Sequence, residues 1–321
     1  MPGRHTEKAF EAAVEVGLLE GGWKRGSAEA YDRANAILPD EFLAFFPKSQ
    51  PELAATLGKE HGKNFEAGVL DALVKTLASH GTLHVLRHGF KFYGKKLEGA
   101  WFRPSHNLNP DVLAKYDANR LTVVRQLKFI PDHDDSVDLA LFVNGIPVAT
   151  LELKNPITGQ NAKDAVEQYK RRDHHQLIFQ FKKRALVHFA VDPNLAFMTT
   201  RIAGDETRFL PFNRGRDGGQ GNPDHPSGFP AAYLWEEVLQ RDSFLDVVGR
   251  FVHHVTEEHV VAGKKEEVEK IIFPRYQQLE VVRKLEAAAR KDGPGHAYLV
   301  QHSAGSGKSN SIAWLAHRLA G

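Results

Sequence analysis

Two carboxylates and one ammonium group stand at even-numbered positions of the stretch 137–154, VDLALFVNGIPVATLELK. Asp138 opens one strand-like run, and Glu152 and Lys154 close the next. Carboxylate oxygens are ligands that Mg²⁺ prefers, and bound Mg²⁺ lowers the pKa of water and offsets charge on a phosphate. A lysine on the same face can position the attacking water. The pattern predicts phosphodiester hydrolysis, with Asp138 and Glu152 as metal ligands and Lys154 as the water-positioning residue.

The same stretch predicts a β-hairpin, because apolar and polar side chains alternate on both sides of Asn144-Gly145. A two-residue turn at Asn144-Gly145 would place Asp138 and Glu152 on opposite faces of the sheet. A three-residue turn over 143–145, with Gly145 in the left-handed conformation, would place them on one face. We predict the three-residue turn.

An isolated Asp…Glu-x-Lys pattern is short, and a charged outer face of a strand is the alternative interpretation. Three aspartates in the preceding loop are rival ligands that we interpret as turn residues: Asp132, Asp134 and Asp135. A helix predicted over 161–173 follows the hairpin, and basic clusters lie at 170–172 and 182–184. These clusters are either solvated or contact DNA phosphates.

A second motif lies near the end of the chain, where SAGSGKS (303–309) follows an apolar run over 297–301 that we expect to be a strand. Lys308 would reach the β- and γ-phosphates of a nucleotide, and Ser309 would ligate Mg²⁺. The other residues expected to bind the nucleotide are Gly305, Ser306 and Gly307. The full motif has glycine where this chain has His302, and a plain glycine-rich turn is the alternative.

The chain ends at Gly321, shortly after this loop. A nucleotide hydrolase also needs a second acidic motif and a closing charge, and the remaining residues do not provide them. We therefore expect the N-terminal part of a longer protein, with little or no ATPase activity of its own.

The chain has 321 residues, enough for two domains, and its net charge of +2 does not by itself indicate a nucleic-acid partner. It has no cysteine, which excludes disulfides and thiolate metal sites and fits a reducing compartment. We find neither a signal-peptide pattern nor an apolar run of membrane-spanning length. We expect a cytoplasmic protein of mixed α/β class.

Apolar spacing predicts helices over 6–20, 40–46, 64–79, 161–173, 235–256 and 276–291. Alternation predicts strands over 83–94, 119–130 and 185–191, whereas 213–228 reads as a long loop and 263–269 as a linker. The 17 histidines form no known metal motif, and His84 and His88 lie in a segment expected to be a strand. We interpret the histidines as structural or solvent-facing.

The order of these motifs resembles the N-terminal half of the restriction (R) subunit of type I restriction–modification enzymes. The runs that carry the resemblance are LRHGFKFYG, NRLTVVRQLKF, VDLALFVNGIPVATLELKNP, FLPFNRG, FPRYQQLEVVRKL and SAGSGKS. The resemblance implies a restriction-endonuclease-like mixed sheet flanked by helices, followed by the first elements of a RecA-like P-loop motor domain. The implied endonuclease domain covers 1–262, with a helical part over 1–80 and a core over 81–200, and the linker and motor start cover 263–321.

The resemblance also implies roles for individual residues. Asp138, Glu152 and Lys154 match the triad of a PD-(D/E)xK nuclease, Gln278 matches a glutamine that reads adenine, and Lys308 and Ser309 match the nucleotide-phosphate and metal positions.

The family carries a Gln-x-x-x-Tyr motif on the helix after the triad, and this chain departs from it. Ala165 stands four residues before Tyr169, and the glutamine is the adjacent Gln168. We include Gln168 and Tyr169 among the expected catalytic residues. Glu11, in the first helix, could add an acidic ligand, but we interpret it as a surface glutamate.

The activity that the resemblance implies is Mg²⁺-dependent endonucleolytic cleavage of double-stranded DNA, coupled to ATP-driven translocation in the full-length protein. The implied partners are methylation (M) and specificity (S) subunits. A standalone repair-type helicase–nuclease and a non-catalytic DNA-clamping module with a degenerate nuclease fold are the alternatives.

Overall fold

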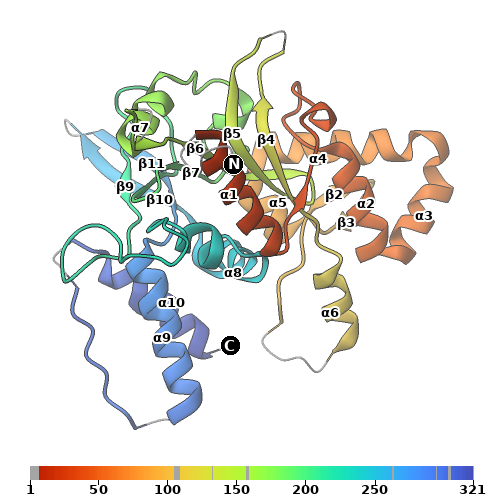
Figure 1. Ribbon diagram of the computed structural model, residues 1–321. Coiled ribbons are helices and arrows are strands. Elements are labelled where there is room, and N and C mark those ends of the chain that lie inside the picture. Colours follow the sequence, from red (N-terminus) through yellow and green to blue (C-terminus); the bar gives the residue numbers. More distant parts are fainter. Residues whose placement is uncertain are drawn as a thin grey trace.

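The computed structural model describes residues 7–104, 109–131, 133–156, 159–261, 264–293, 295–302 and 305–320. A seven-stranded mixed sheet lies at the centre, with helices on both faces (Figure 1). This arrangement confirms the predicted mixed α/β class. In the part of the chain that the structure describes, no helix is both long enough and apolar enough to cross a membrane.

The strands of the central sheet follow the order β1-β4-β5-β6-β7-β8-β9. Their bounds are Lys24–Arg25 (β1), Leu121–Lys128 (β4), Ser136–Val143 (β5), Ile146–Leu153 (β6), Val187–Val191 (β7), Ala196–Thr199 (β8) and Leu210–Pro211 (β9). The pairs β1–β4 and β6–β7 are parallel, and the other neighbouring pairs are antiparallel. Parallel neighbours need a crossover connection, which contains helix α7 (Ala162–Arg171) between β6 and β7.

The hairpin β5–β6 turns through two residues, so the predicted three-residue turn is wrong. Val143 pairs with Ile146, and Asn144 and Gly145 between them have φ angles of 51° and 77°. Two consecutive positive φ angles form the turn whose twist matches that of antiparallel strands, and Asn-Gly is the pair that adopts it most readily. The local turn chemistry therefore decided the loop length.

A β-bulge in β6 places Asp138 and Glu152 on one face of the sheet, as the three-residue turn was expected to do. The register shifts after Phe142, which pairs with Pro147, so that Leu141 pairs with Ala149 and one residue, Val148, is skipped. Beyond the bulge Leu139 pairs with Leu151. Asp138 and Glu152, one step further along each strand, are therefore cross-strand neighbours on one face.

Both faces of the sheet are covered, so β6 is buried along its whole length. Helix α1 (Glu7–Glu20) packs on one face through Phe10, Val14 and Leu18, as its spacing predicted. Helix α7 and the short helix η4 (Leu177–Phe179) pack on the other face, in a core that includes Tyr169 and Phe179.

The N-terminal part of the chain extends the first core with helices. Their bounds are Pro39–Ser49 (α2), Pro51–His61 (α3), Phe65–His80 (α4) and Thr82–His88 (α5). Helices α2 and α4 confirm predictions, whereas the strand predicted over 83–94 is wrong up to His88, where helix α5 forms, and correct only at 90–92. Gly81, with a φ of 88°, ends α4 and starts α5, and Leu83 and Leu86 of α5 are buried one helical turn apart. A short apolar run is compatible with the periodicity of a helix and with that of a strand, and tertiary packing decides between the two.

After α5 the chain forms a separate hairpin, β2 (Phe90–Phe92) with β3 (Lys95–Leu97), and then helix α6 (Pro110–Asp117). The helix predicted over 235–256 is only partly correct. Helical turns η5 (Leu234–Val238), α8 (Arg241–Asp246) and η6 (Val247–Phe251) occupy its first part, and strand β10 (His253–Val261) replaces its end.

The predicted linker over 263–269 is wrong for the residues that the structure describes. Strand β11 (Lys264–Ile272) pairs with β10 in a two-stranded antiparallel ribbon. The sequence of β11 shows no apolar periodicity, because most of this ribbon is held together by backbone hydrogen bonds and not by the burial of apolar side chains.

Helices α9 (Tyr276–Asp292) and α10 (Lys308–Ala320) follow, and α9 confirms its prediction. The strand predicted over 297–301 does not form, and Leu299 within it is 95% exposed. Among the described residues no strand lies beside this segment to pair with it. The structure thus contains the helix after the glycine-rich loop without the sheet of a second domain.

Candidate active site

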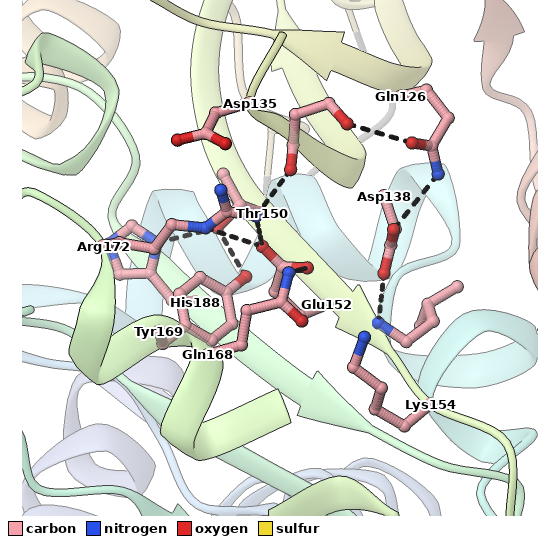
Figure 2. A network of polar contacts seen from close by, with 12 residues as sticks. Gln126, Asp135, Asp138, Thr150, Glu152, Lys154, Gln168, Tyr169, Arg172 and His188 are labelled. Carbon is pink, nitrogen blue, oxygen red and sulfur yellow. Dashed lines mark hydrogen bonds and ion pairs between the residues drawn. The ribbon is translucent and has the colours of Figure 1, made fainter. Parts of the chain in front are cut away.

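Asp138 is oriented by both neighbouring strands (Figure 2). Its Oδ2 accepts a hydrogen bond from the backbone N–H of Leu153 at 2.7 Å, and its Oδ1 accepts one from Gln126 Nε2 at 3.1 Å. Gln126 has a φ of 47° and lies on β4 opposite Asp138, between the pairs Arg125–Leu139 and Leu127–Val137. Burial raises the pKa of Asp138.

Glu152 is fully buried and accepts hydrogen bonds from Gln168 of α7 and from Arg172, the residue that directly follows this helix. Its Oε1 lies 2.6 Å from Arg172 Nη2, and its Oε2 lies 2.7 Å from Gln168 Nε2. Burial, followed by the charge of Asp138, raises the pKa of Glu152 to about 8 although Arg172 opposes the shift. A cation bound near these two carboxylates would offset the repulsion between them.

Lys154 directly follows β6, and its backbone N–H donates to the carbonyl of Val191 at 2.9 Å. Its side chain is only 12% exposed, and its Nζ lies 3.5 Å from Glu7 Oε1 on α1. Burial raises the pKa of Asp138 and of Glu152, and the ammonium charge of Lys154 opposes both increases, so Lys154 acts on both carboxylates. The three residues predicted to do the chemistry therefore gather at one end of the β5–β6 hairpin (Figure 2).

Helix α7 positions the residues that follow the triad. Asn161 caps its first turn by accepting from Lys163 N at 2.9 Å, and Asp164 accepts from Asn161 N at 2.7 Å. This capping box fixes where the helix begins, and Gln168 then falls on the side that faces Glu152.

Tyr169 lies beneath the site and does not hydrogen-bond to either carboxylate. Its hydroxyl is 2.8 Å from Thr150 Oγ1, which is 2.8 Å from His188 Nδ1 on β7. All three side chains are buried, and this chain of polar groups joins α7 to the sheet. The geometry gives Tyr169 a supporting position below Glu152.

Arg172 is a site residue that the sequence analysis assigned to a solvated or phosphate-contacting cluster. Its guanidinium instead binds Glu152 and the carbonyl of Ser136, the latter at 2.5 Å. The spacing of four residues from Gln168 places both side chains on one helix face, and this was the signal that could have identified it.

The second basic cluster, 182–184, also departs from the phosphate-contact interpretation. Lys182 pairs with Glu269 at 2.5 Å, and Arg184 is buried and donates to the carbonyl of Asn35 at 2.6 and 2.9 Å. A buried guanidinium satisfied by a backbone carbonyl is part of the core and is not available to DNA.

Glu11 is only 4% exposed, so its interpretation as a surface glutamate is wrong. It accepts from Arg125 Nε at 2.8 Å and from Gln126 Nε2 at 3.3 Å. The same Gln126 amide bonds to Asp138, and the charge of Glu11 raises the pKa of Asp138. Sequence spacing alone could not find this link, because it joins α1 to β4 and β5.

Asp134 and Asp135, the two rival aspartates that the structure describes, form no hydrogen bond with Asp138 or Glu152. Asp134 pairs with Lys128 at 2.6 Å, and Asp135 lies 3.6 Å from His133 Nδ1. Both are exposed, and Asp132 lies outside the described residues.

The donor set at Asp138 and Glu152 suits a hard cation such as Mg²⁺, because both ligands are carboxylates and each side chain is fixed by hydrogen bonds. Mg²⁺ usually keeps several waters and takes one or two protein carboxylates. Two carboxylates are therefore enough protein ligands, with water and phosphate oxygens completing the shell.

The glycine-rich loop is held by the helix that precedes it. Gln278 Nε2 donates to the carbonyls of Ser306 and Gly307 at 2.9 and 3.0 Å, and its Oε1 accepts from Arg275 N at 2.9 Å. Gly307 has a φ of 75°, and a side chain there would begin 2.3 Å from Gln278 Nε2, so another residue would strain the backbone and displace the Gln278 amide.

The residues of this loop that were predicted to bind the nucleotide fall into two groups. Gly305, Ser306 and Gly307 line a cavity of about 410 Å³ together with Gln278. Lys308 and Ser309 begin α10, and Lys308 Nζ is 3.5 Å from the carbonyl of His302. Ser303 and Ala304 lie outside the described residues.

Comparison with known proteins supports the resemblance seen in the sequence. Residues 101–207 match the family described as "Type I restriction enzyme R protein N terminus", and this range contains the triad and α7. A protein of Methanocaldococcus jannaschii described as "Putative type I restriction enzyme MjaVIIIP endonuclease subunit" is 25% identical over 216 residues. The alignment covers 62% of this chain and 18% of that protein, so the chain spans less than a fifth of its relative.

Proposed function

We propose that this chain, which is similar over residues 101–207 to the N terminus of type I restriction enzyme R proteins, cleaves double-stranded DNA in a Mg²⁺-dependent reaction. The observation that carries the proposal is the convergence of Asp138, Glu152 and Lys154 at one end of the β5–β6 hairpin. A buried carboxylate (Glu152), a partly buried one (Asp138) and a nearby ammonium group (Lys154) are the groups that metal-assisted phosphodiester hydrolysis uses.

In the proposed reaction Asp138 and Glu152 would hold the cation. A bound Mg²⁺ lowers the pKa of its water and offsets charge on the scissile phosphate. Lys154 places its ammonium near both carboxylates, where it can orient the attacking water or stabilise charge on a phosphate oxygen.

The surrounding residues position the ligands. Gln126 and Leu153 N–H orient Asp138, while Gln168 and Arg172 orient Glu152. Arg172 also supplies the positive charge that a buried carboxylate needs when no cation is bound. Such partners keep the carboxylates in place before substrate arrives.

We further propose that the full-length protein couples cleavage to ATP-driven translocation, together with M and S subunits. The support is the family and the loop of Gly305, Ser306, Gly307, Lys308 and Ser309 beside Gln278. The 321-residue chain should hydrolyse little or no ATP by itself, since the loop lacks the sheet of a complete motor domain among the described residues.

The test uses Asp138→Ala and Lys154→Ala in the full-length protein, reconstituted with its M and S subunits. We expect both variants to lose cleavage of plasmid DNA while ATP hydrolysis persists. Asp134→Ala is the matched control, because Asp134 is an exposed carboxylate near the same strand and should cleave normally. If Asp138→Ala or Lys154→Ala still linearises plasmid, the triad assignment is wrong.

A non-catalytic DNA clamp is the second candidate, and one observation favours it: Arg172 and Gln168 already occupy the oxygens of Glu152. Calorimetric titration of the chain with MgCl₂ separates the two functions. If the chain is a nuclease, it should bind Mg²⁺ and the Glu152→Ala variant should not. If it is a clamp, Mg²⁺ binding should not depend on Glu152. Copurification of M and S subunits would distinguish a type I enzyme from a standalone repair helicase–nuclease.

A further inference from the structure

Three histidines lie in a row where α4 meets α5. The ring centroids of His80 and His84 are 4.7 Å apart, and those of His84 and His88 are 5.2 Å apart. His84 and His88 both belong to α5 and are separated by four residues, so they share one helix face. In the strand expected from the sequence this spacing would have kept the two rings far apart.

The break between the two helices brings His80 next to this pair. Gly81 has a φ of 88°, and Thr82 N donates to the carbonyl of Lys182 at 2.8 Å, which fixes the start of α5. Ser79 Oγ lies 2.8 Å from His80 Nδ1. A hydrogen bond at Nδ1 makes Nε2 the nitrogen that can ligate an ion, as in many histidine metal sites.

The row borders a cavity of about 430 Å³ whose opposite wall includes His253 and His254 of β10. The charged groups around this cavity already have partners. Arg87 donates to the carbonyls of Val248 and Val252, and Glu269 pairs with Lys182 and His254. The cavity therefore presents mainly imidazole nitrogens to a ligand.

We propose that His84 and His88, with His80 as third ligand, bind a divalent transition-metal ion such as Zn²⁺. Imidazole nitrogen suits Zn²⁺, Ni²⁺ and Cu²⁺, whereas Mg²⁺ takes oxygen ligands. This site is separate from the carboxylate pair, and the proposal does not depend on the nuclease activity. Among the described residues these three rings do not form a group whose ligand atoms all lie within 4.8 Å of one another, so the proposal requires the rings to rotate when the ion binds.

Another histidine cluster serves as the internal control. Asp173, His174 and His175 have ligand atoms within 4.8 Å of one another, and all three are exposed. The geometry there follows from a turn, because Asp173 accepts from His175 N at 2.9 Å and from Gln176 Nε2 at 3.2 Å. It lies elsewhere in the fold, directly after α7.

Calorimetric titration of the 321-residue chain with ZnCl₂, in excess MgCl₂, tests the proposal. We expect the wild-type chain to bind Zn²⁺ that Mg²⁺ does not displace. His84→Gln and His88→Gln should each weaken binding by about tenfold or more, since each removes a ligand. The double variant His174→Gln/His175→Gln should bind Zn²⁺ as the wild type does.

Thermal melting checks the fold of each variant, and His88 is exposed, so His88→Gln should fold normally. Zn²⁺ should raise the melting temperature of the wild type and of the His174/His175 variant, but not that of His88→Gln. Unchanged Zn²⁺ binding in His84→Gln/His88→Gln would overturn the proposal. So would loss of binding only in the His174/His175 variant, or complete displacement of Zn²⁺ by Mg²⁺.

Discussion

At the scale of single residues, the buried carboxylate of Glu152 is the most demanding feature of the site. A charge without exposure to water needs a partner, and Arg172 and Gln168 supply three hydrogen bonds to it. Gln168 lies on α7 and Arg172 directly follows it, so both contacts depend on how the end of this helix is placed against β6. The chemistry of the site and the stability of the domain therefore depend on the same contacts.

Replacing Arg172 with methionine should leave Glu152 buried without its ion-pair partner. We expect the free energy of unfolding to fall by about 3–5 kcal/mol, the usual cost of removing one partner of a buried pair. Chemical denaturation of the chain at a pH above about 8, where Glu152 carries its charge, measures the loss. Arg171→Met is the control, because Arg171 is exposed and should change stability by less than about 0.5 kcal/mol. Equal losses in both variants would contradict the ion-pair argument.

His188 should make stability depend on pH. Burial lowers its pKa to about 3, whereas an unfolded histidine titrates near pH 6.5. Below about pH 6.5 the unfolded chain gains a proton that the folded chain does not, so the free energy of unfolding falls by up to about 1.4 kcal/mol per pH unit. Above about pH 7 both states are neutral at this residue, and the effect vanishes.

Denaturation of His188→Gln and of the wild-type chain between pH 4 and pH 7 isolates this titration. Glutamine does not titrate, so the stability advantage of the wild type should shrink as the pH falls through this window. An advantage that stays constant would mean that His188 becomes protonated in the folded state.

At the scale of elements, the β5–β6 hairpin combines a short turn with a bulge. The turn at Asn144-Gly145 also packs against α2, because a side chain at Gly145 would begin 2.2 Å from the carbonyl of Leu38. Leu38 N in turn donates to the Gly145 carbonyl at 2.8 Å. The hairpin end is therefore fixed both by its own twist and by contact with the N-terminal helices.

Gly145→Ala should destabilise the protein by more than about 1 kcal/mol, because both the positive φ and the close Leu38 carbonyl oppose a methyl group. Gly94→Ala is the matched control, since Gly94 has a φ of 75° but nothing within 4 Å of an added methyl group. Thermal or chemical denaturation measures both. A loss no larger than that of Gly94→Ala would show that the contact with Leu38 is unimportant.

At the scale of the whole molecule, α9 and α10 are attached to the sheet domain through Asp246. This carboxylate pairs with Arg318 of α10 at 2.8 Å and with Arg283 of α9 at 3.3 Å. Trp314 of α10 also packs against Phe251 and His253. The helix that begins in the glycine-rich loop thus ends against the domain that holds the proposed cleavage site.

Asp246→Asn should loosen α10 without unfolding the sheet. Hydrogen bonds to charged groups contribute about 1.5–3 kcal/mol, so we expect amide protection in α10 to fall by roughly tenfold or more. Hydrogen exchange measures this change. Asp242→Asn is the control, because Asp242 pairs with Tyr116, Arg103 and Arg241 but with no residue of α10. Equal loss of protection in the two variants would contradict the role of Asp246.

Local patterns predicted the long helices and strands well, since α1, α4, α7, α9 and β4 carry clear apolar periodicity. The errors fell on α5, on β10–β11 and on residues 297–301. A seven-residue helix, an exposed ribbon and an unpaired apolar run have no distinct period, so their structure depends on which neighbours they meet.

The sequence by itself determined which groups can do chemistry here, because the identities and spacing of Asp138, Glu152 and Lys154 are local properties of one hairpin. Only the tertiary structure decided that Asp138 and Glu152 share a face, since the bulge at Val148 offsets a turn that would have separated them. It also decided that Arg172 faces Glu152. Strand register and helix docking arise from contacts between distant segments, and a local pattern does not contain them.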